Sequence, residues 1–241
     1  MKILVLGHRG MLGHMVHKYF STKKECELVT INSRWSSEDF IREVLSFNGN
    51  YIINCIGAIH QRKTEFDVNV DLPIWLDSNC VDCRIIHPGT DFETDGDRYG
   101  VSKKEASEYI LKKGRVTKII KTSIFGPELV SRSSIFEWFM NSENEVGGWT
   151  ENYWNGITTL QWTKICYDML VSWDSYEIVN IPATECISKY QLLNLIKRVF
   201  NKDIIVNKDP SMRANRCLSG TLKVKDINKQ LLELKEFYYG N

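Results

Sequence analysis

The chain has 241 residues, of which 43% are hydrophobic and 25% are charged, and its formal net charge is +1. This length can bury a substantial core, and the composition is that of an ordinary globular protein. The near-neutral charge gives no basic field for nucleic acid, and no apolar run approaches the roughly 20 residues that cross a bilayer. We therefore expect neither nucleic acid nor a membrane as a partner. The first apolar run is too short for a signal peptide, so a cytoplasmic location is expected.

The cysteine pattern points to reduced thiols. Seven cysteines are scattered along the chain without the spacing of a disulfide framework, at positions 26, 55, 80, 83, 166, 186 and 217. We expect no disulfide from such a pattern. Cys80 and Cys83 have the spacing of half a zinc site, but no second Cys/His pair follows at the required distance, so no metal is expected.

Apolar runs and helical patterns alternate through the first half of the chain. Strands are predicted near 2–6, 27–31, 51–56, 83–87 and 116–122, and helices near 11–22, 37–47, 68–80 and 101–113. This alternation is typical of βαβ units with right-handed crossovers. The sequence therefore predicts an α/β protein with a doubly wound parallel sheet.

The regular pattern weakens after Gly126-Pro127, where we expect a smaller C-terminal lobe to begin. The predicted domains are 1–126 and 127–241, with a segment of about 154–181 returning to the first domain. Helices are expected near 133–141, 158–171, 188–200 and 226–238, and strands near 176–181 and 203–206. A segment rich in Trp and Gly, 147–156, receives no strand or helix.

Three glycines follow the first strand directly, at a spacing of three. Without Cβ atoms, they permit a sharp turn and a close approach of backbone N–H groups to a pyrophosphate at a helix N-terminus. The spacing is a variant of the usual dinucleotide fingerprint, so its position between a strand and an amphipathic helix is what carries the prediction. The predicted dinucleotide contacts in this turn are Gly7, Arg9, Gly10, Met11, Leu12 and Gly13.

The second predicted strand ends at Asn32, Ser33 and Arg34, where NAD-binding proteins usually carry an acid. An acid repels a 2′-phosphate, whereas Asn32 and Ser33 can donate hydrogen bonds and an arginine can pair with the phosphate. Arg9 is a second candidate for that phosphate, with an exposed loop arginine as the alternative. The sequence favours NADPH and leaves NADH open.

Tyr99 and Lys103 lie one helical turn apart, so that an ammonium on the same face would lower the pKa of the phenol and make Tyr99 a general acid. Tyr109 and Lys113 repeat the spacing, but they lie about 15 Å further along the helix at about 1.5 Å per residue. We therefore place the site at Tyr99, near the carboxyl edge of the sheet where ligands bind.

Thr90, beside Asp91, follows the fourth strand and can hold a substrate oxygen next to the phenol. The alternative is that the segment 87–90 is only a turn. Because Tyr99 and Lys103 follow closely, we favour the functional interpretation.

These motifs together resemble the extended short-chain dehydrogenase/reductase family, whose fold is Rossmann-like. The likeness rests on the glycine turn, the segments 54–57 and 121–126, and the Thr90-Asp91 and Tyr99/Lys103 pairs. Within the family, the likeness is strongest to the dTDP-4-dehydrorhamnose reductase group, and the glycine turn also resembles that of GDP-fucose synthase, in which the matching arginine serves NADPH.

The resemblance implies a role for each matched residue. Thr90 would orient a keto oxygen, Tyr99 would donate the proton, and Lys103 would bind the nicotinamide ribose and lower the pKa of Tyr99. Asn69 would steady the lysine. The cofactor would also be lined by Cys55, Ile56, Gly57 and Ala58.

The implied activity is NADPH-dependent reduction of the C4 keto group of a nucleotide-activated 6-deoxy-4-ketohexose. A nucleotide-sugar epimerase and a non-catalytic NADP-binding regulatory subunit are the alternatives. The chain departs from the family pattern in two ways: Gly89 replaces the usual Ser, and the segment between Thr90 and Tyr99 is short.

The C-terminal lobe is expected to bind the nucleotide half of the sugar substrate. Phe136, Trp149 and Trp154 are candidates for stacking, with core packing as the alternative, and Arg213 and Arg216 are candidates for the diphosphate. The sequence leaves the oligomeric state open, with a homodimer as one candidate.

Overall fold

The structure is a computed structural model that describes residues 1–59, 65–130 and 133–240. The chain forms two compact units, each built from two stretches of sequence. The first consists of Met1–Lys121 and Thr163–Asn180, and the second of Thr122–Trp162 and Ile181–Asn241. The chain thus leaves the first unit after Lys121, where the sequence suggested a boundary at 126.

A six-stranded parallel sheet forms the centre of the first unit. Its strands are β1 (Lys2–Leu6), β2 (Glu27–Thr30), β3 (Tyr51–Asn54), β4 (Arg84–Gly89), β5 (Thr117–Lys121) and β9 (Val179–Asn180). Their order is β2-β1-β3-β4-β5-β9, and every neighbouring pair is parallel. The predicted doubly wound α/β fold is confirmed. The strand order reverses between β1 and β3, which is where such sheets bind ligands.

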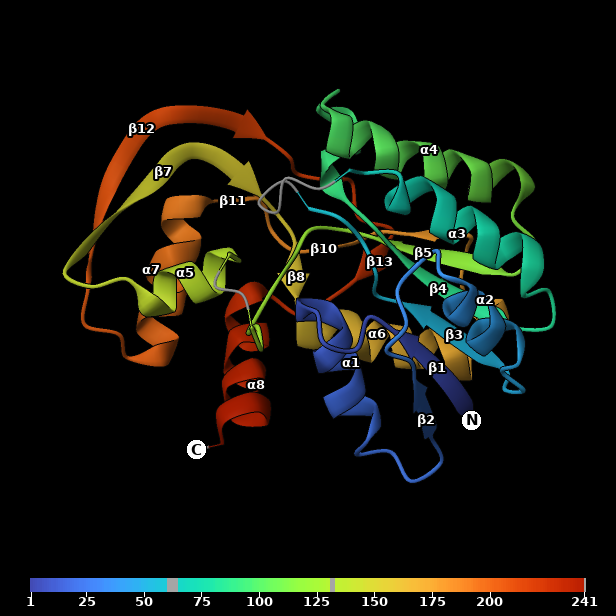
Figure 1. Cartoon of the computed structure of the whole chain (residues 1–241). Helices are drawn as coiled ribbons and strands as arrows, with labels where there is room; N and C mark the ends of the chain where they lie inside the picture. The colour runs from blue at the N-terminus through green and yellow to red at the C-terminus, as the bar shows by residue number, and fades with distance from the viewer. Residues whose placement is uncertain (60–64, 131–132, 241) are drawn as a thin grey trace. The chain divides into compact units, whose positions relative to one another are not determined.

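Helices cover both faces of this sheet, as Figure 1 shows. They are α1 (Met11–Phe20), α2 (Glu38–Leu45), α3 (Val68–Asn79), α4 (Arg98–Lys113) and α6 (Thr159–Val171), of which the part from Thr163 belongs to this unit. Phe40 of α2 and Leu72 of α3 share a core with Leu4 and Ile52 of the strands. On the other side, Tyr167 of α6 meets Phe20 of α1 edge to face, with 5.7 Å between ring centroids.

The start of α4 is fixed by a cap and by a close contact. The side chain of Asp97 accepts a hydrogen bond from the Gly100 backbone N–H at 2.6 Å. A Cβ atom at Gly100 would lie 2.1 Å from the carbonyl oxygen of Phe92, in the short 3-10 helix η2 (Asp91–Thr94). The helix therefore begins at Arg98, before the expected residue 101, and Tyr99 lies in its first turn.

The second unit contains a long strand pair that the sequence did not reveal. Strand β7 (Glu145–Trp154) runs parallel to β12 (Ile205–Asn215) and antiparallel to β11 (Ile187–Ser188). A Cβ atom at Gly148 would lie 3.0 Å from Cα of Tyr190, so this glycine lets β7 pack against the backbone of a helix. The expectation that 147–156 forms no strand was wrong, because its glycines serve close packing.

Helices α5 (Ile135–Asn141), α7 (Lys189–Phe200) and α8 (Ile227–Tyr239) complete the core of this unit. Ser188 and Gln191 form the predicted capping box at the start of α7. The remaining short elements are β6 (Ile124–Phe125), β8 (Ile157–Thr158), β10 (Pro182–Ala183), β13 (Leu222–Lys223) and the 3-10 helix η3 (Trp173–Ser175), the last of which lies in the first unit.

Cys186 and Cys217 form a disulfide, with their Cα atoms 5.8 Å apart. The expectation of no disulfide was therefore wrong. The two cysteines are 31 residues apart in sequence, but both flank the end of β7: Ser188 pairs with Tyr153, and the Arg216 N–H donates to the Tyr153 carbonyl. Long-range strand pairing brings them together, which spacing alone does not show.

In the ranges that the structure covers, none of the helices is both long enough and apolar enough to cross a membrane.

Candidate functional site

The glycine turn brings β1, α1 and β3 into close contact. Gly7 has a φ of +75°, and a Cβ atom there would lie 2.9 Å from Ile56 and 3.0 Å from the Cys55 backbone. A Cβ atom at Gly13 would lie 2.1 Å from the Gly7 carbonyl oxygen. Gly10 begins the turn of α1 by donating its N–H to that same oxygen at 2.9 Å. The turn therefore excludes side chains at the N-terminus of α1, which suits a pyrophosphate.

The segment after β3 is held by buried side chains. Asn69 accepts a hydrogen bond from the Ala58 N–H at 2.8 Å and donates to the Ala58 carbonyl at 3.1 Å and to the Ser102 hydroxyl at 3.2 Å. Ser102 is the residue before Lys103 in α4, and the role of Asn69 in steadying that lysine stays a prediction. A Cβ atom at Gly57 would lie 3.1 Å from the Asn69 oxygen. Burial raises the pKa of the Cys55 thiol, which keeps this predicted cofactor contact uncharged.

An acid lies beside the end of β2, although the strand itself carries none. Asn32 and Arg34 are exposed, as is Arg9 in the glycine turn. The Ser33 hydroxyl, however, donates a hydrogen bond to Oε2 of Glu43, in α2, at 2.6 Å. A carboxylate from a neighbouring helix is therefore present where the sequence suggested only hydrogen-bond donors and an arginine.

Thr90 lies at the carboxyl end of β4 and caps η2. Its backbone N–H donates to Oε1 of Glu93 at 3.5 Å, and its hydroxyl accepts from the Phe92 N–H at 3.3 Å. The hydroxyl also contacts Oδ1 of the neighbouring Asp91 at 3.2 Å. The predicted turn residues thus form a capped, rigid corner.

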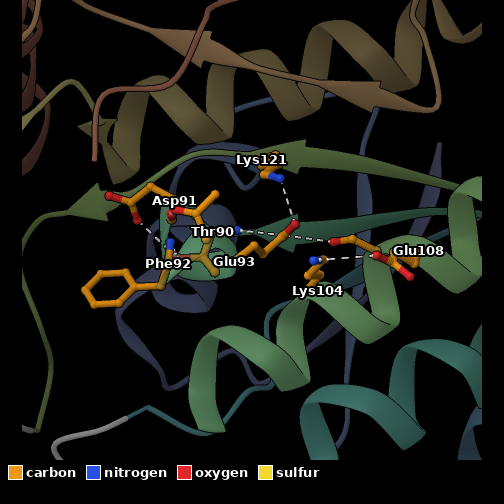
Figure 2. A network of polar contacts seen from close by, with 9 residues as sticks. Thr90, Asp91, Phe92, Glu93, Lys104, Glu108 and Lys121 are labelled. Carbon is orange, nitrogen blue, oxygen red and sulfur yellow. Dashed lines mark hydrogen bonds and ion pairs between the residues drawn. The ribbon is translucent and has the colours of Figure 1, made fainter. Parts of the chain in front are cut away.

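The buried carboxylate of Glu93 ties this corner to the rest of the sheet. Lys121 of β5 donates to its Oε2 at 2.7 Å, and the Ser107 hydroxyl of α4 donates to its Oε1 at 2.9 Å. Figure 2 shows Glu93 with Thr90 and Lys121 as its neighbours. The side chain of Glu93 is 5% exposed, so its charge depends on these partners.

Gly89, which stands where the family pattern has Ser, is explained by a close contact between strands. A Cβ atom at Gly89 would lie 3.0 Å from Cγ2 of Ile119 and 3.0 Å from Cβ of Lys121. These distances are tighter than ordinary van der Waals contact, so a serine would press on β5. Gly89 therefore lets the end of β4 lie close to the lysine that holds Glu93.

Tyr99 is brought to Thr90, as expected, but its acidity differs from the expectation. Burial raises the pKa of the Tyr99 phenol above its ordinary value, a hydrogen bond with Thr90 lowers it, and the nearby carboxylates of Asp91, Asp97 and Glu93 raise it further. The ring packs edge to face against Phe66 and Phe92. The phenol therefore keeps its proton at neutral pH.

The pKa of Tyr99 is raised, whereas the resemblance implied that Lys103 lowers it. Nζ of Lys103 donates to the Pro88 carbonyl at 2.7 Å and lies 3.4 Å from Nε2 of His87. Burial lowers the pKa of Lys103 to about 8, against an opposing effect of Glu93. The amine is directed at the end of β4, which the one-turn spacing from Tyr99 did not show.

The aromatic residues predicted to contact substrate are core residues of the second unit. Phe136 is 0% exposed and Trp154 is 3% exposed. Trp154 packs against Phe125 at 5.4 Å and Phe136 against Phe200 at 5.1 Å between ring centroids. The stacking prediction for Phe136 and Trp154 was wrong, because apolar packing uses both rings. Trp149 remains 38% exposed.

The two predicted arginines lie at the end of β12 and just beyond it. The exposed Arg213 forms an ion pair with Glu151 of β7, with 2.7 Å between Nε and Oε2. The backbone N–H of Arg216 donates to the Tyr153 carbonyl at 3.1 Å. Arg213 thus contacts β7 through its side chain, and Arg216 contacts it through its backbone. Their role in binding stays a prediction.

Glu93 is the site residue that sequence reasoning missed. Its signal was present, because Thr90 and Glu93 have the spacing of a capping box. Within the described ranges, no group of three or more His, Cys, Asp or Glu side chains could hold a metal ion.

No protein-family model matches the chain, and no curated protein matches it. Solved structures do match over nearly its whole length. A dTDP-4-dehydrorhamnose reductase from Clostridium acetobutylicum has a TM-score of 0.79 at 18% identity, covering 99% of this chain and 100% of that one. A dTDP-4-dehydrorhamnose reductase from Bacillus anthracis, in complex with NADP, has a TM-score of 0.78 at 11% identity, covering 99% and 98%.

A UDP-glucose 4-epimerase from Thermotoga maritima, with UDP-glucose, is also similar, with a TM-score of 0.74 at 13% identity and coverage of 99% of both chains. The matches share a Rossmann-like α/β architecture. More specifically, the chain has the fold of the extended short-chain dehydrogenases/reductases.

The Glu93 network leads to a first prediction. Replacing Glu93 by Gln should lower the free energy of unfolding by about 2–4 kcal/mol, because the partly buried Lys121 ammonium loses its buried counter-charge. Urea unfolding measures this change. In the control Glu108→Gln, an exposed residue of α4 that pairs with Lys104 and Lys112, the loss should stay below about 1 kcal/mol. Equal losses in the two variants would contradict the account.

Proposed function

We propose that the chain is an NADPH-dependent reductase that acts on the C4 keto group of a nucleotide-activated 6-deoxy-4-ketohexose. The observation that carries the proposal is the hydrogen bond between Thr90 and Tyr99 at the carboxyl end of β4. A hydroxyl and a protonated phenol that meet there can together hold and protonate a carbonyl oxygen. The likeness to two dTDP-4-dehydrorhamnose reductases supports this substrate class.

The cofactor part of the proposal rests on the glycine turn. Gly7 and Gly13 leave room for a pyrophosphate against the backbone at the start of α1. Arg9 and Arg34 are exposed and would pair with a 2′-phosphate, and the structure of one neighbour contains NADP. The backbone of Cys55, Ile56, Gly57 and Ala58 would line the rest of the dinucleotide. When bound, NADPH supplies the hydride.

In the proposed reaction, Tyr99 donates its proton to the substrate oxygen while C4 is reduced, so that the ketone becomes a secondary alcohol. Burial and neighbouring carboxylates keep the phenol protonated until that transfer. Thr90 orients the oxygen beforehand, and its hydrogen bond stabilises the phenolate afterwards. Lys103 would then supply the proton that restores the phenol, since its pKa of about 8 lies close to neutrality.

We assign the diphosphate of the substrate to Arg213 and Arg216. Arg213 pairs with the carboxylate of Glu151, and an exposed ion pair of this kind contributes little free energy. A diphosphate can therefore take the place of Glu151 as the partner of Arg213. Arg216 lies beside the Cys186–Cys217 disulfide, which restrains the backbone around it.

A nucleotide-sugar epimerase is the second candidate, favoured by the likeness to the UDP-glucose 4-epimerase. The two reactions differ in their use of the cofactor, because a reductase consumes it and an epimerase restores it. A regulatory subunit without catalysis is disfavoured, since such a chain needs neither the Thr90–Tyr99 hydrogen bond nor a buried Lys103.

The second prediction tests the reductase directly. Purified protein should oxidise NADPH with at least one member of a panel of dTDP-, UDP- and GDP-4-keto-6-deoxysugars, followed by absorbance. Tyr99→Phe should lower kcat by about 10²–10⁴ because the proton donor is gone.

Tyr109→Phe is the matched control for this assay. Tyr109 lies on the same helix with the same spacing to a lysine, and its hydroxyl contacts Ser78 of α3 at 3.2 Å. Its kcat should stay within about twofold of wild type, since exposed polar contacts contribute little. No oxidation with any sugar, or an undiminished rate in Tyr99→Phe, would overturn the proposal.

The third prediction concerns the choice of cofactor. Glu43→Gln should tighten NADPH binding about fivefold and leave NADH within about twofold, because it removes a negative charge beside the proposed 2′-phosphate position. Titration of each cofactor by calorimetry measures both dissociation constants. The control is Glu38→Gln at the start of the same helix. A shift of equal size for NADPH and NADH in Glu43→Gln would place the 2′-phosphate elsewhere.

A further inference from the structure

The carboxylate of Glu93 joins three elements around the site, and the proposed reaction gives it no task. Its Oε1 accepts from the Thr90 N–H at 3.5 Å and from the Ser107 hydroxyl of α4 at 2.9 Å, and its Oε2 accepts from the Lys121 ammonium of β5 at 2.7 Å. Figure 2 shows Glu93 with Lys121 beside it, and Glu93 is 7% exposed. Burying a paired carboxylate costs free energy, and apolar side chains could join the same elements without that cost. A structural role alone therefore does not require the charge.

Ser107 brings this carboxylate close to Lys103. Tyr99, Lys103 and Ser107 are spaced by four residues in α4, so their side chains lie on one face of the helix. The hydrogen bond from Ser107 holds Glu93 on that face. Lys103 in turn donates to the Pro88 carbonyl at 2.7 Å, in the last residues of the strand that leads into η2. The carboxylate and the ammonium are therefore about one helical turn apart, at the same end of β4.

The other titratable groups around Lys103 carry no charge near neutral pH. Nε2 of His87, in β4, lies 3.4 Å from Nζ of Lys103, and burial and the positive charge of Lys103 hold the pKa of His87 well below its usual range. Tyr99 lies one turn earlier in α4, and its raised pKa keeps the phenol neutral. Burial lowers the pKa of Lys103 to about 8, and the charge of Glu93 acts against this effect. Glu93 therefore supplies negative charge to a buried ammonium.

We propose that Glu93 is a positioning residue for Lys103: it fixes η2 against α4 and supplies the negative charge that favours the ammonium form of the lysine. At a pKa of about 8, about nine-tenths of Lys103 is ammonium at pH 7. Without the charge of Glu93, less of the cost of burying the ammonium is offset. The lysine would then lose its proton at a lower pH.

The consequence for catalysis rests on the proposed function. An ammonium at Lys103 has three donors with which it would bind the nicotinamide ribose, and it can return a proton to Tyr99 after each turnover. A neutral amine has no such proton to give. Glu93 would act on the reaction through Lys103, without touching substrate or cofactor. The effect of its charge on Lys103 needs neither substrate nor turnover to be measured.

The first test measures the proton affinity of Lys103 in the full chain, without cofactor or substrate. The pH dependence of its ¹³Cε shift is followed by NMR in protein with labelled lysine, and the signal that is missing in Lys103→Gln identifies the residue. In Glu93→Gln the amide oxygen can still accept from Thr90 and Ser107, but the charge is gone. The proton affinity of Lys103 should fall about three- to tenfold. An unchanged proton affinity would overturn the proposal.

Ser107→Ala is the matched control, because it removes a contact of Glu93 and keeps the charge. The carboxylate loses its hydrogen bond to α4 and retains its other partners. The proton affinity of Lys103 should stay within about twofold of wild type there. Glu108→Gln, which removes an exposed carboxylate from the same helix, should also stay within about twofold, because solvent screens that charge. A fall in either control as large as in Glu93→Gln would refute the role of the charge.

The second test changes the partner of Glu93 on β5. Lys121→Gln keeps a side-chain N–H that can donate to Glu93 but removes the positive charge that opposes it. The proton affinity of Lys103 should remain at or above the wild-type value, because the field of Glu93 is no longer balanced. A fall in proton affinity would contradict the proposal, since it would show that any damage to this network has the same effect. This variant decides the matter if Glu93→Gln does not fold.

Turnover gives the last readout. Because Lys103 loses its proton at a lower pH in Glu93→Gln, the upper pH limit of kcat should move to lower pH by the factor that the titration gives, and Glu108→Gln should keep the wild-type profile. A kcat that is reduced equally at every pH would speak for a purely structural role and against the proposal. The expected titrations of Lys103 together with no turnover on any sugar would sink the proposed reductase and leave this inference standing.

Discussion

The packing of η2 against the first turns of α4 is the contact on which the candidate site depends. Gly100 is pressed against the Phe92 carbonyl, and any side chain there would push the two helices apart. This approach brings the phenol of Tyr99 to Thr90 and the hydroxyl of Ser107 to Glu93. The buried charges in the corner are tolerated because each finds partners at hydrogen-bond distance. The packing of η2 against α4 therefore determines both where the phenol of Tyr99 lies and which charged groups surround it.

Local features of the site could be predicted from the sequence because they depend on neighbours in the chain. The glycine turn is one, since a strand, a turn and the start of a helix within thirteen residues leave few alternatives. Thr90 and Tyr99 are another, because they are only nine positions apart and the segment between them has helix caps at Thr90 and Asp97. The doubly wound sheet followed from the alternation of strands and helices in the same way.

Features that depend on distant parts of the chain could not be read in advance. Phe136 and Trp154 are exposed or buried according to what packs on them, and both lie in the hydrophobic core of the second unit. Cys186 and Cys217 meet only because β7 pairs with strands on both sides. The direction of the Lys103 amine depends on Pro88 and His87, to which it is drawn across the helix–sheet packing. Spacing along one helix says nothing about partners on a strand.

The central claim is that this corner of the fold protonates a ketone while C4 of a sugar is reduced. The most direct test is isotopic transfer, with NADPH deuterated at both C4 positions of the nicotinamide and a nucleotide-linked 4-keto-6-deoxysugar. We expect one NADP⁺ formed per sugar and one deuterium in the sugar product. Mass spectrometry should show the added mass, and NMR should place the deuterium at C4. Deuterium absent from C4, or a sugar inverted at C4 without loss of NADPH, would contradict the account.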